Sequence, residues 1–223
     1  MTLPTPHALA ETRASWHRVA EHVLAAGQFA AAGTIRLRPW PGGFATAVGI
    51  DGRRLAVVGD QLVVEQGDAM RSQPLTTLAA VAAFAGVRPG LSGSYTPVTS
   101  ADPDAPLVVD PAAALLMADW FSLGDAALRR FAVGAEVPAV PVLWPEHFDL
   151  AITLDAVNYG ASPGDDAIPG PYLYVGPHGG PPSRDDYWNA PFGAAATADR
   201  IRTAADAVDF FHQGRSLLSG GAT

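Results

Sequence analysis

The sequence WPGGFATAV at residues 40–48 has a counterpart further along the chain, WPEHFDLAI at residues 144–152. The two stretches begin 104 residues apart, and at the same offset Asp51 falls on Asp155 without a gap. Small insertions then align the next glycine–aspartate pair and the next apolar run of each half. This agreement in order and spacing predicts a tandem duplication. The alternative is that two amphipathic hairpins look alike by chance.

The segments around these stretches predict the same elements in each half. Alternating apolar residues indicate strands, and helices are expected to begin at Thr5-Pro6 and at Asp110-Pro111. Gly27 is expected to end the first helix, and Asp51-Gly52 predicts a hairpin turn. We therefore expect an α+β fold, a tandem duplicated α-β-β-β-α unit with an antiparallel sheet and pseudo-twofold symmetry.

The expected domain boundaries follow from changes in composition. Residues 1–87 form the first repeat, residues 111–223 form the second, and the Pro- and Gly-rich residues 88–110 are expected to form a linker within one globular protein. Residues 34–66 and 138–176 are expected to superpose as three-stranded units, with their tryptophans and phenylalanines in equivalent places.

The composition excludes several kinds of chemistry. All 14 basic residues are arginine, and there is no lysine or cysteine. This excludes lysine Schiff bases, the usual P-loop, thiolate nucleophiles and Cys-based metal sites. The lack of cysteine leaves the redox compartment open. The sequence also leaves the oligomeric state open.

The charge and hydropathy restrict the partners. A net charge of −8 disfavours nucleic acid and membrane surfaces. The only basic runs are the short pairs Arg53-Arg54 and Arg129-Arg130. No targeting segment or stretch of about 20 apolar residues is recognisable, so a soluble cytoplasmic protein is expected.

The densest polar cluster lies within a strand expected over residues 142–154. On such a strand His147 and Asp149 point to the same face, where the first half has Gly43 and Ala45. A histidine beside a carboxylate can take part in acid–base chemistry or share a metal. We therefore expect both side chains in one polar pocket. The alternative is a solvated strand face with a mild ion pair.

A long loop over residues 176–193 is the second candidate region. Loops of this length in compact domains often bind ligands, and the alternative is an ordered cover over the sheet. Candidate binding residues from both regions and the strand between them are Glu146, His147, Asp149, Tyr159, His178, Trp188 and Asn189. No catalytic residue, metal ligand or cofactor is assigned from the sequence.

The first helix carries His17, Glu21 and His22 in the spacing H-x-x-x-E-H. This spacing matches neither H-E-x-x-H nor H-x-x-E-H, the two zinc-binding helix patterns. The sequence therefore favours a solvated helix face over a metal site.

Two segments, WPEHFD at residues 144–149 and PYLYVGP at residues 171–177, resemble those of an uncharacterised bacterial family of unknown function. The resemblance implies no activity, substrate or catalytic residue. The residues themselves favour a module that binds a small molecule or a partner in a cleft between the repeats. One alternative is a His/Asp-dependent enzyme, with or without a metal, and another is a protein-interaction subunit.

Residues 160–164 match G-x-S-x-G, the pattern of the nucleophile elbow in hydrolases. The residue after Ser162 is Pro163, which has no N–H to donate to an oxyanion. We therefore expect a turn, and a fluorophosphonate probe should leave Ser162 unlabelled when the intact protein is weighed by mass spectrometry. A known serine hydrolase labelled in parallel is the control, and an adduct on Ser162 would contradict the prediction.

Overall fold

The computed structural model describes residues 3–91, 93–133, 135 and 139–220. The chain is 34% helix and 26% strand, and the described strands pair antiparallel with their neighbours. The expected α+β class with an antiparallel sheet is therefore confirmed. Two compact units result, one made of Met1–Asp119 and Leu143–Phe148 and the other of Trp120–Val142 and Asp149–Thr223. This division differs from the expected repeats, because residues 143–148 of the second half belong to the first unit.

The first unit begins with three consecutive helical segments, α1 (Pro6–Val19), the π-helical η1 (Ala20–Ala25) and α2 (Ala26–Ala32). As predicted, the Thr5 hydroxyl caps α1 by accepting from Ala8 N–H at 3.1 Å. The expectation that Gly27 ends this helix is wrong, since the helix ends at Gly33, which has a φ of 67°. Gly27 is a close-packing position, because a Cβ there would lie 2.7 Å from Val87 Cγ1.

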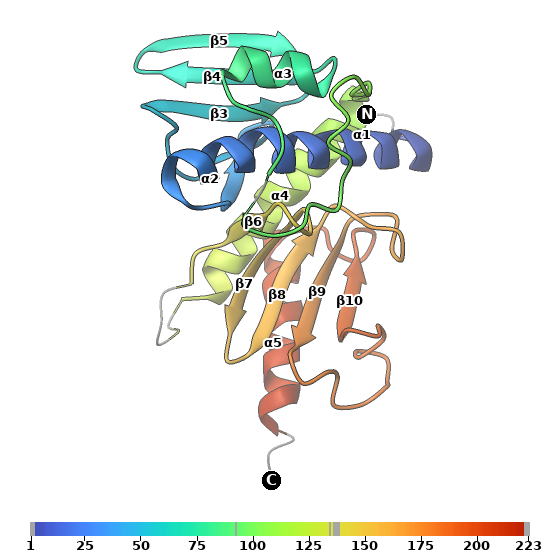
Figure 1. Cartoon of the computed structure of the whole chain (residues 1–223). Coiled ribbons are helices and arrows are strands. Elements are labelled where there is room, and N and C mark those ends of the chain that lie inside the picture. Colours follow the sequence, from blue (N-terminus) through green and yellow to red (C-terminus); the bar gives the residue numbers. More distant parts are fainter. Residues whose placement is uncertain (1–2, 92, 134, 136–138, 221–223) are drawn as a thin grey trace. The chain divides into compact units, whose positions relative to one another are not determined.

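The strands of the first unit are β1 (Leu37–Trp40), β2 (Gly43–Thr46), β3 (Arg53–Val58), β4 (Gln61–Gln66), β5 (Ala69–Pro74) and most of β6 (Val142–Trp144). β6 pairs with β1 at Leu143 and Leu37, and β1 to β5 follow in chain order. The helical segment η1 packs against β1 and β2, and α3 (Leu78–Ala85) lies beside β4 and β5 (Figure 1). The predicted turn at Asp51-Gly52 is confirmed, with φ values of 50° and 75°.

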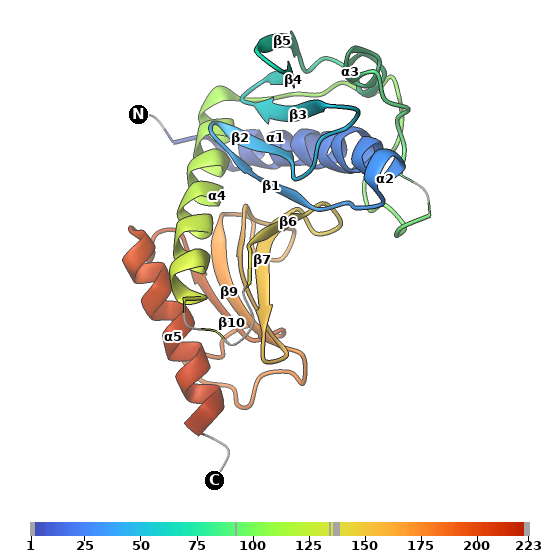
Figure 2. The ribbon, with the colours of Figure 1, turned by 90° about the vertical axis from the view of Figure 1, so that its left-hand side faces the viewer.

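The second unit holds the C-terminal part of α4 (Pro111–Phe131), β7 (Asp149–Leu154), β8 (Val157–Ser162), β9 (Tyr172–Pro177), β10 (Ala194–Thr197) and α5 (Ala204–Gly220). Helices α4 and α5 lie on the same face of these strands (Figure 2). Between them and the sheet, the ring centroid of Phe131 lies 4.5 Å from that of Tyr159 and 5.5 Å from that of Phe211. None of the described helices has the length and apolar character needed to cross a membrane.

Each half contains more strands than the sequence predicts. The three-stranded repeat is wrong, because the described residues give five strands to each half, β1–β5 and β6–β10. The outer strands read AMRSQP and AAAT and lack the alternation expected of a strand. They form because backbone N–H and C=O groups pair with the adjacent strand largely independently of side-chain type.

Residues 93–110, within the segment expected as a linker, are joined to α1 and η1 through polar side chains. The Thr12 hydroxyl accepts a hydrogen bond from Asp110 N–H at 2.9 Å, and the Ser15 hydroxyl accepts one from Val108 N–H at 2.9 Å. Both hydroxyls are on buried residues. These hydrogen bonds attach the segment to α1 of the first unit, so it is not an unattached linker.

The Glu21 carboxylate of η1 anchors the same segment, and its side chain is fully buried. It accepts hydrogen bonds from the Tyr95 hydroxyl at 3.0 Å, from Val98 N–H at 3.1 Å and from Thr99 N–H at 2.8 Å, and from the Thr99 hydroxyl. Beside it, His22 Nε2 lies 3.0 Å from the Thr99 carbonyl oxygen. The prediction of a solvated helix face is wrong, because the covering segment excludes water and supplies the donors that the carboxylate needs.

We expect the substitution Glu21→Gln to lower the free energy of unfolding by about 2–3 kcal/mol, because an amide offers a single acceptor oxygen to these donors. Urea unfolding followed by tryptophan fluorescence measures the change. Hydrogen exchange at Val98 and Thr99 should become faster. The control is Glu11→Gln on the exposed part of α1, where Glu11 pairs with His7 at 3.2 Å. Equal losses in the two variants would contradict the anchoring role of Glu21.

Candidate functional site

The strand expected over residues 142–154 is interrupted by a turn at residues 145–148. Phe148 ends this turn with a φ of 51°, and its buried ring packs edge-on against Phe44 with centroids 5.4 Å apart. The alternation of side chains does not continue through the turn. The prediction that His147 and Asp149 share one strand face is therefore wrong.

The turn residues belong to the first unit and lie near its half-buried His17. His147 is exposed, but it is close enough to His17 to affect its titration. Glu146 is half-buried, and its Oε2 has no hydrogen-bond partner among the described residues. Burial and the Glu21 carboxylate raise the pKa of Tyr95, and Glu146 adds to this effect.

His17 connects α1 to the turn. Its ring stacks on Phe148 with centroids 5.2 Å apart and an interplanar angle of 12°, and its Nε2 lies 2.6 Å from the Pro145 carbonyl oxygen. Burial lowers the pKa of His17 more than the nearby Glu21 carboxylate raises it. A neutral imidazole that donates from Nε2 satisfies this geometry.

Asp149, at the start of β7, lies in the second unit and is buried. It accepts a hydrogen bond from the Tyr174 hydroxyl. Burial and the Asp149 carboxylate raise the pKa of Tyr174 well above its usual value, so the phenol is the donor. Gly160 makes room for the tyrosine, because a Cβ at that position would overlap the Tyr174 ring. Tyr174 is thus a polar partner that the sequence did not single out.

Two predicted site residues lie in the core of the second unit. Tyr159 is 2% exposed beside Phe131 and Phe211, and burial raises its pKa to about 12. Trp188 is 1% exposed and meets Tyr187 edge-on with centroids 4.9 Å apart. Neither side chain is accessible to a ligand.

The remaining two predicted residues are exposed in the second unit. His178 Nε2 lies 3.1 Å from Asn158 Oδ1 at the end of β9. Asn189 exchanges two hydrogen bonds with the backbone of Ala195, donating to its carbonyl at 3.1 Å and accepting from its N–H at 2.9 Å. Asn189 therefore fixes the end of the long loop to β10.

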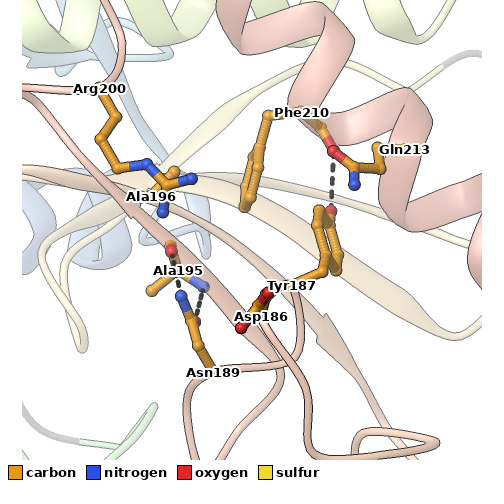
Figure 3. Close-up of a pocket in the computed structure, with 8 residues that line it drawn as sticks. All are labelled: Asp186, Tyr187, Asn189, Ala195, Ala196, Arg200, Phe210 and Gln213. Carbon is orange, nitrogen blue, oxygen red and sulfur yellow. Dashed lines mark hydrogen bonds between the residues drawn. The ribbon is translucent and has the colours of Figure 1, made fainter.

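A pocket of about 170 Å³ opens where this loop, β10 and α5 meet (Figure 3). Its lining residues all belong to the second unit and are Asp186, Tyr187, Asn189, Ala195, Ala196, Arg200, Phe210 and Gln213. The Tyr187 hydroxyl donates to the Phe210 carbonyl at 2.8 Å and so ties the loop to α5. Of the predicted residues, Asn189 lines this pocket.

The lining combines charge, amide and aromatic surface. Figure 3 shows the Arg200 guanidinium group on one side, the ring of Phe210 beside the hollow, and Gln213 on the helix. Among the described residues, no carboxylate lies within 4.0 Å of the Arg200 guanidinium, and Asp186 likewise forms no ion pair there. The pocket can therefore offer a cation and an anion to a ligand.

One local feature of the sequence, an Asx-type turn at Asp185, could have indicated that this loop is ordered. Asp185 precedes the lining residues and accepts hydrogen bonds from Tyr187 N–H and Trp188 N–H, both at 2.9 Å, in an Asx-type turn. These bonds lower the pKa of Asp185. Phe210 and Gln213 stand three residues apart on α5 and reach the loop only through the fold.

No group of three or more His, Asp or Glu side chains in the described part of the chain is arranged to hold a metal ion. Comparisons with protein-family models, with curated proteins and with solved structures found no match to this chain.

The lowered pKa of His17 gives a pH dependence of stability. As the pH falls below about 6.5, the unfolded chain takes up the proton before the folded protein does, so the free energy of unfolding decreases. We expect His17→Gln to remove part of the decrease between pH 7 and pH 5, measured by urea unfolding at each pH. The control is His7→Gln, since the His7 side chain is 82% exposed on the same helix. An unchanged slope in His17→Gln would contradict the prediction.

Proposed function

We propose that this protein binds a small molecule that carries a carboxylate, and that the pocket between the long loop, β10 and α5 is the binding site. The observation that supports the proposal is the Arg200 guanidinium at a hollow that also presents the ring of Phe210 and the amide of Gln213. A guanidinium group binds carboxylates with two parallel hydrogen bonds. An aromatic wall next to it favours an apolar group on the same ligand.

The size of the pocket limits the ligand. A volume of about 170 Å³ is below the range of roughly 300–1,000 Å³ that is typical for drug-sized ligands. The ligand is accordingly a small metabolite with one ring or a short chain. Hydrogen bonds between Asn189 and Ala195 and between Tyr187 and Phe210 hold this side of the pocket in place. The pocket is therefore preformed for its ligand.

The enzyme alternative has less support. His147 is exposed in a turn of the first unit, and Asp149 is engaged by the Tyr174 hydroxyl in the second. Acid–base catalysis needs a group within hydrogen-bond reach of the substrate and of its partner. Binding in a cleft between the repeats and a role as a protein-interaction subunit stay predictions.

We also infer that the two halves of the chain arose by duplication. Asp51 and Asp155 are 104 residues apart and have φ values of 50° and 51°, so both halves use a left-handed residue at the same hairpin. Phe44 and Phe148 share that offset, and both are buried. A superposition of residues 34–66 on the described part of 138–176 would test this inference.

Ligand binding tests the proposed function directly. Benzoate is a suitable probe, with benzamide as the neutral control, and isothermal titration with saturation-transfer NMR gives the affinity. We expect benzoate to bind and Arg200→Gln to weaken its binding about tenfold, because the charged hydrogen bonds are lost. The matched control is Arg202→Gln, which removes the same charge two residues away from an exposed position.

Three results would count against the proposal. Benzoate and benzamide would bind equally well if the guanidinium had no role. The two arginine variants would behave alike if only the net charge mattered. A site with a millimolar Kd binds its ligand with roughly 4 kcal/mol. If no benzoate binding is seen at about 10 mM, the pocket binds more weakly than this, which would exclude a carboxylate site of useful affinity.

A further inference from the structure

The pocket of the second unit is lined by a carboxylate, that of Asp186, as well as by the Arg200 guanidinium (Figure 3). Asp186 belongs to the long loop, whereas Arg200 follows β10, and both residues are exposed. Within the described ranges of the chain, no arginine nitrogen lies within 4.0 Å of the Asp186 carboxylate. The pocket therefore presents two opposite charges that do not neutralise each other by direct contact.

The carboxylates that are close to the pocket in sequence differ from Asp186 in their hydrogen bonds. Asp185 accepts from two backbone N–H groups of its own loop, both at 2.9 Å. Asp206 accepts from two backbone N–H groups just before α5, at 2.9 Å and 2.8 Å. A hydrogen bond from the Thr197 side chain lowers the pKa of Asp199. These three carboxylates shape the local backbone, whereas Asp186 lines the pocket and accepts no hydrogen bond from the described residues.

Most of the other polar groups at the pocket already have partners. The amide of Asn189 and the hydroxyl of Tyr187 are hydrogen-bonded to backbone groups. The charged ends of Arg200 and Asp186 and the amide of Gln213 are the remaining polar side-chain groups of the lining. A ligand with one charge would pair with one of the two ions and leave the other without a partner. A ligand that carries both charges is complementary to the whole lining.

Two aromatic rings add to the attraction for a positive charge. Phe210 and Tyr187 both line the pocket, and their ring centroids lie 5.3 Å apart at an interplanar angle of 35°. The face of an aromatic ring attracts a ligand cation, and it also packs against carbon atoms. An ammonium group beside a ring or a short chain therefore finds favourable contacts here in addition to the Asp186 carboxylate.

The positions of the two ions indicate where the ligand carries its charges. Arg200 and Asp186 come from separate segments and form no ion pair with each other in the part of the chain that the structure describes. A ligand with a carboxylate at one end and an amine at the other can reach both residues, each through hydrogen bonds of about 2.9 Å. The pocket volume of about 170 Å³ allows one ring or a short chain between these ends.

We propose that the ligand of this pocket is a small amino acid that carries its amine and its carboxylate at opposite ends. The proposal rests on the small-molecule site proposed above and names the class of ligand that this site takes. The ligand's carboxylate accepts hydrogen bonds from the Arg200 guanidinium, and its ammonium group donates to the Asp186 carboxylate. The carbon atoms between them pack on Phe210. Asp186 thus distinguishes an amino acid from a simple carboxylic acid.

Two ligands of the same shape test the proposal with the full chain. 4-(Aminomethyl)benzoate and 4-ethylbenzoate differ only in an ammonium group that takes the place of a methyl group. In isothermal titration we expect the amine to bind about tenfold more tightly. Asp186→Asn should abolish this preference. The variant should bind 4-ethylbenzoate at least as tightly as the unchanged protein does, because a negative charge near the ligand's carboxylate is removed.

The matched control is Asp209→Asn, which removes the same charge from an exposed position on α5 outside the pocket lining and should keep the preference. Equal binding of the two ligands to the unchanged protein, or a preference that persists in Asp186→Asn, overturns this inference and leaves the carboxylate site intact. A preference lost in both variants shows that only net charge is sensed and also overturns it.

Two further results are decisive. Equal losses for both ligands in Asp186→Asn show that Asp186 maintains the shape of the pocket, which overturns its role in recognising an amine. No binding of either ligand to the unchanged protein overturns the proposed function itself, and this inference with it. Circular dichroism of each variant checks that the fold is unchanged.

Discussion

The buried carboxylate of Glu21 is the constraint on which the first unit depends. A charged group without water is costly unless hydrogen bonds surround it, and here the donors come from Tyr95, Val98 and Thr99, more than 70 residues away in sequence. The long proline-rich segment is therefore ordered against the helix. Glu21 lies in a π-helical turn. Such turns inside helices occur frequently at functional sites.

A second constraint is the turn that separates β6 from β7. Phe148 takes a left-handed backbone conformation, and its ring packs against Phe44 and His17. The turn places residues 143–148 in the first unit and starts β7 in the second. His147 is consequently exposed, whereas Asp149 is buried against Tyr174. Two residues that are two positions apart in sequence thus have unrelated environments.

Arginine side chains have two different roles in this protein. All cationic side chains of this protein are arginines, and a guanidinium group has a fixed planar fork suited to carboxylates. At the pocket, Arg200 stands beside an aromatic ring and an amide, which suits a small ligand. On the sheet of the first unit, the guanidinium groups of Arg38 and Arg54 instead stack on the ring of Trp40. The proposed pocket thus favours a carboxylate ligand on a protein that is itself acidic.

The sequence by itself determined the α+β class, the Thr5 cap and the Asp51-Gly52 turn, because helix caps and hairpin turns depend on residues adjacent in the chain. It also pointed to the loop over residues 176–193, which contains Asn189. Only the tertiary structure decided the burial of Glu21, the edge strands β5 and β10, the partner of Asp149 and the stacking of Arg38 and Arg54 on Trp40. These features depend on side chains and backbone groups that meet through strand pairing and packing, and periodicity within one segment carries no information on what covers it.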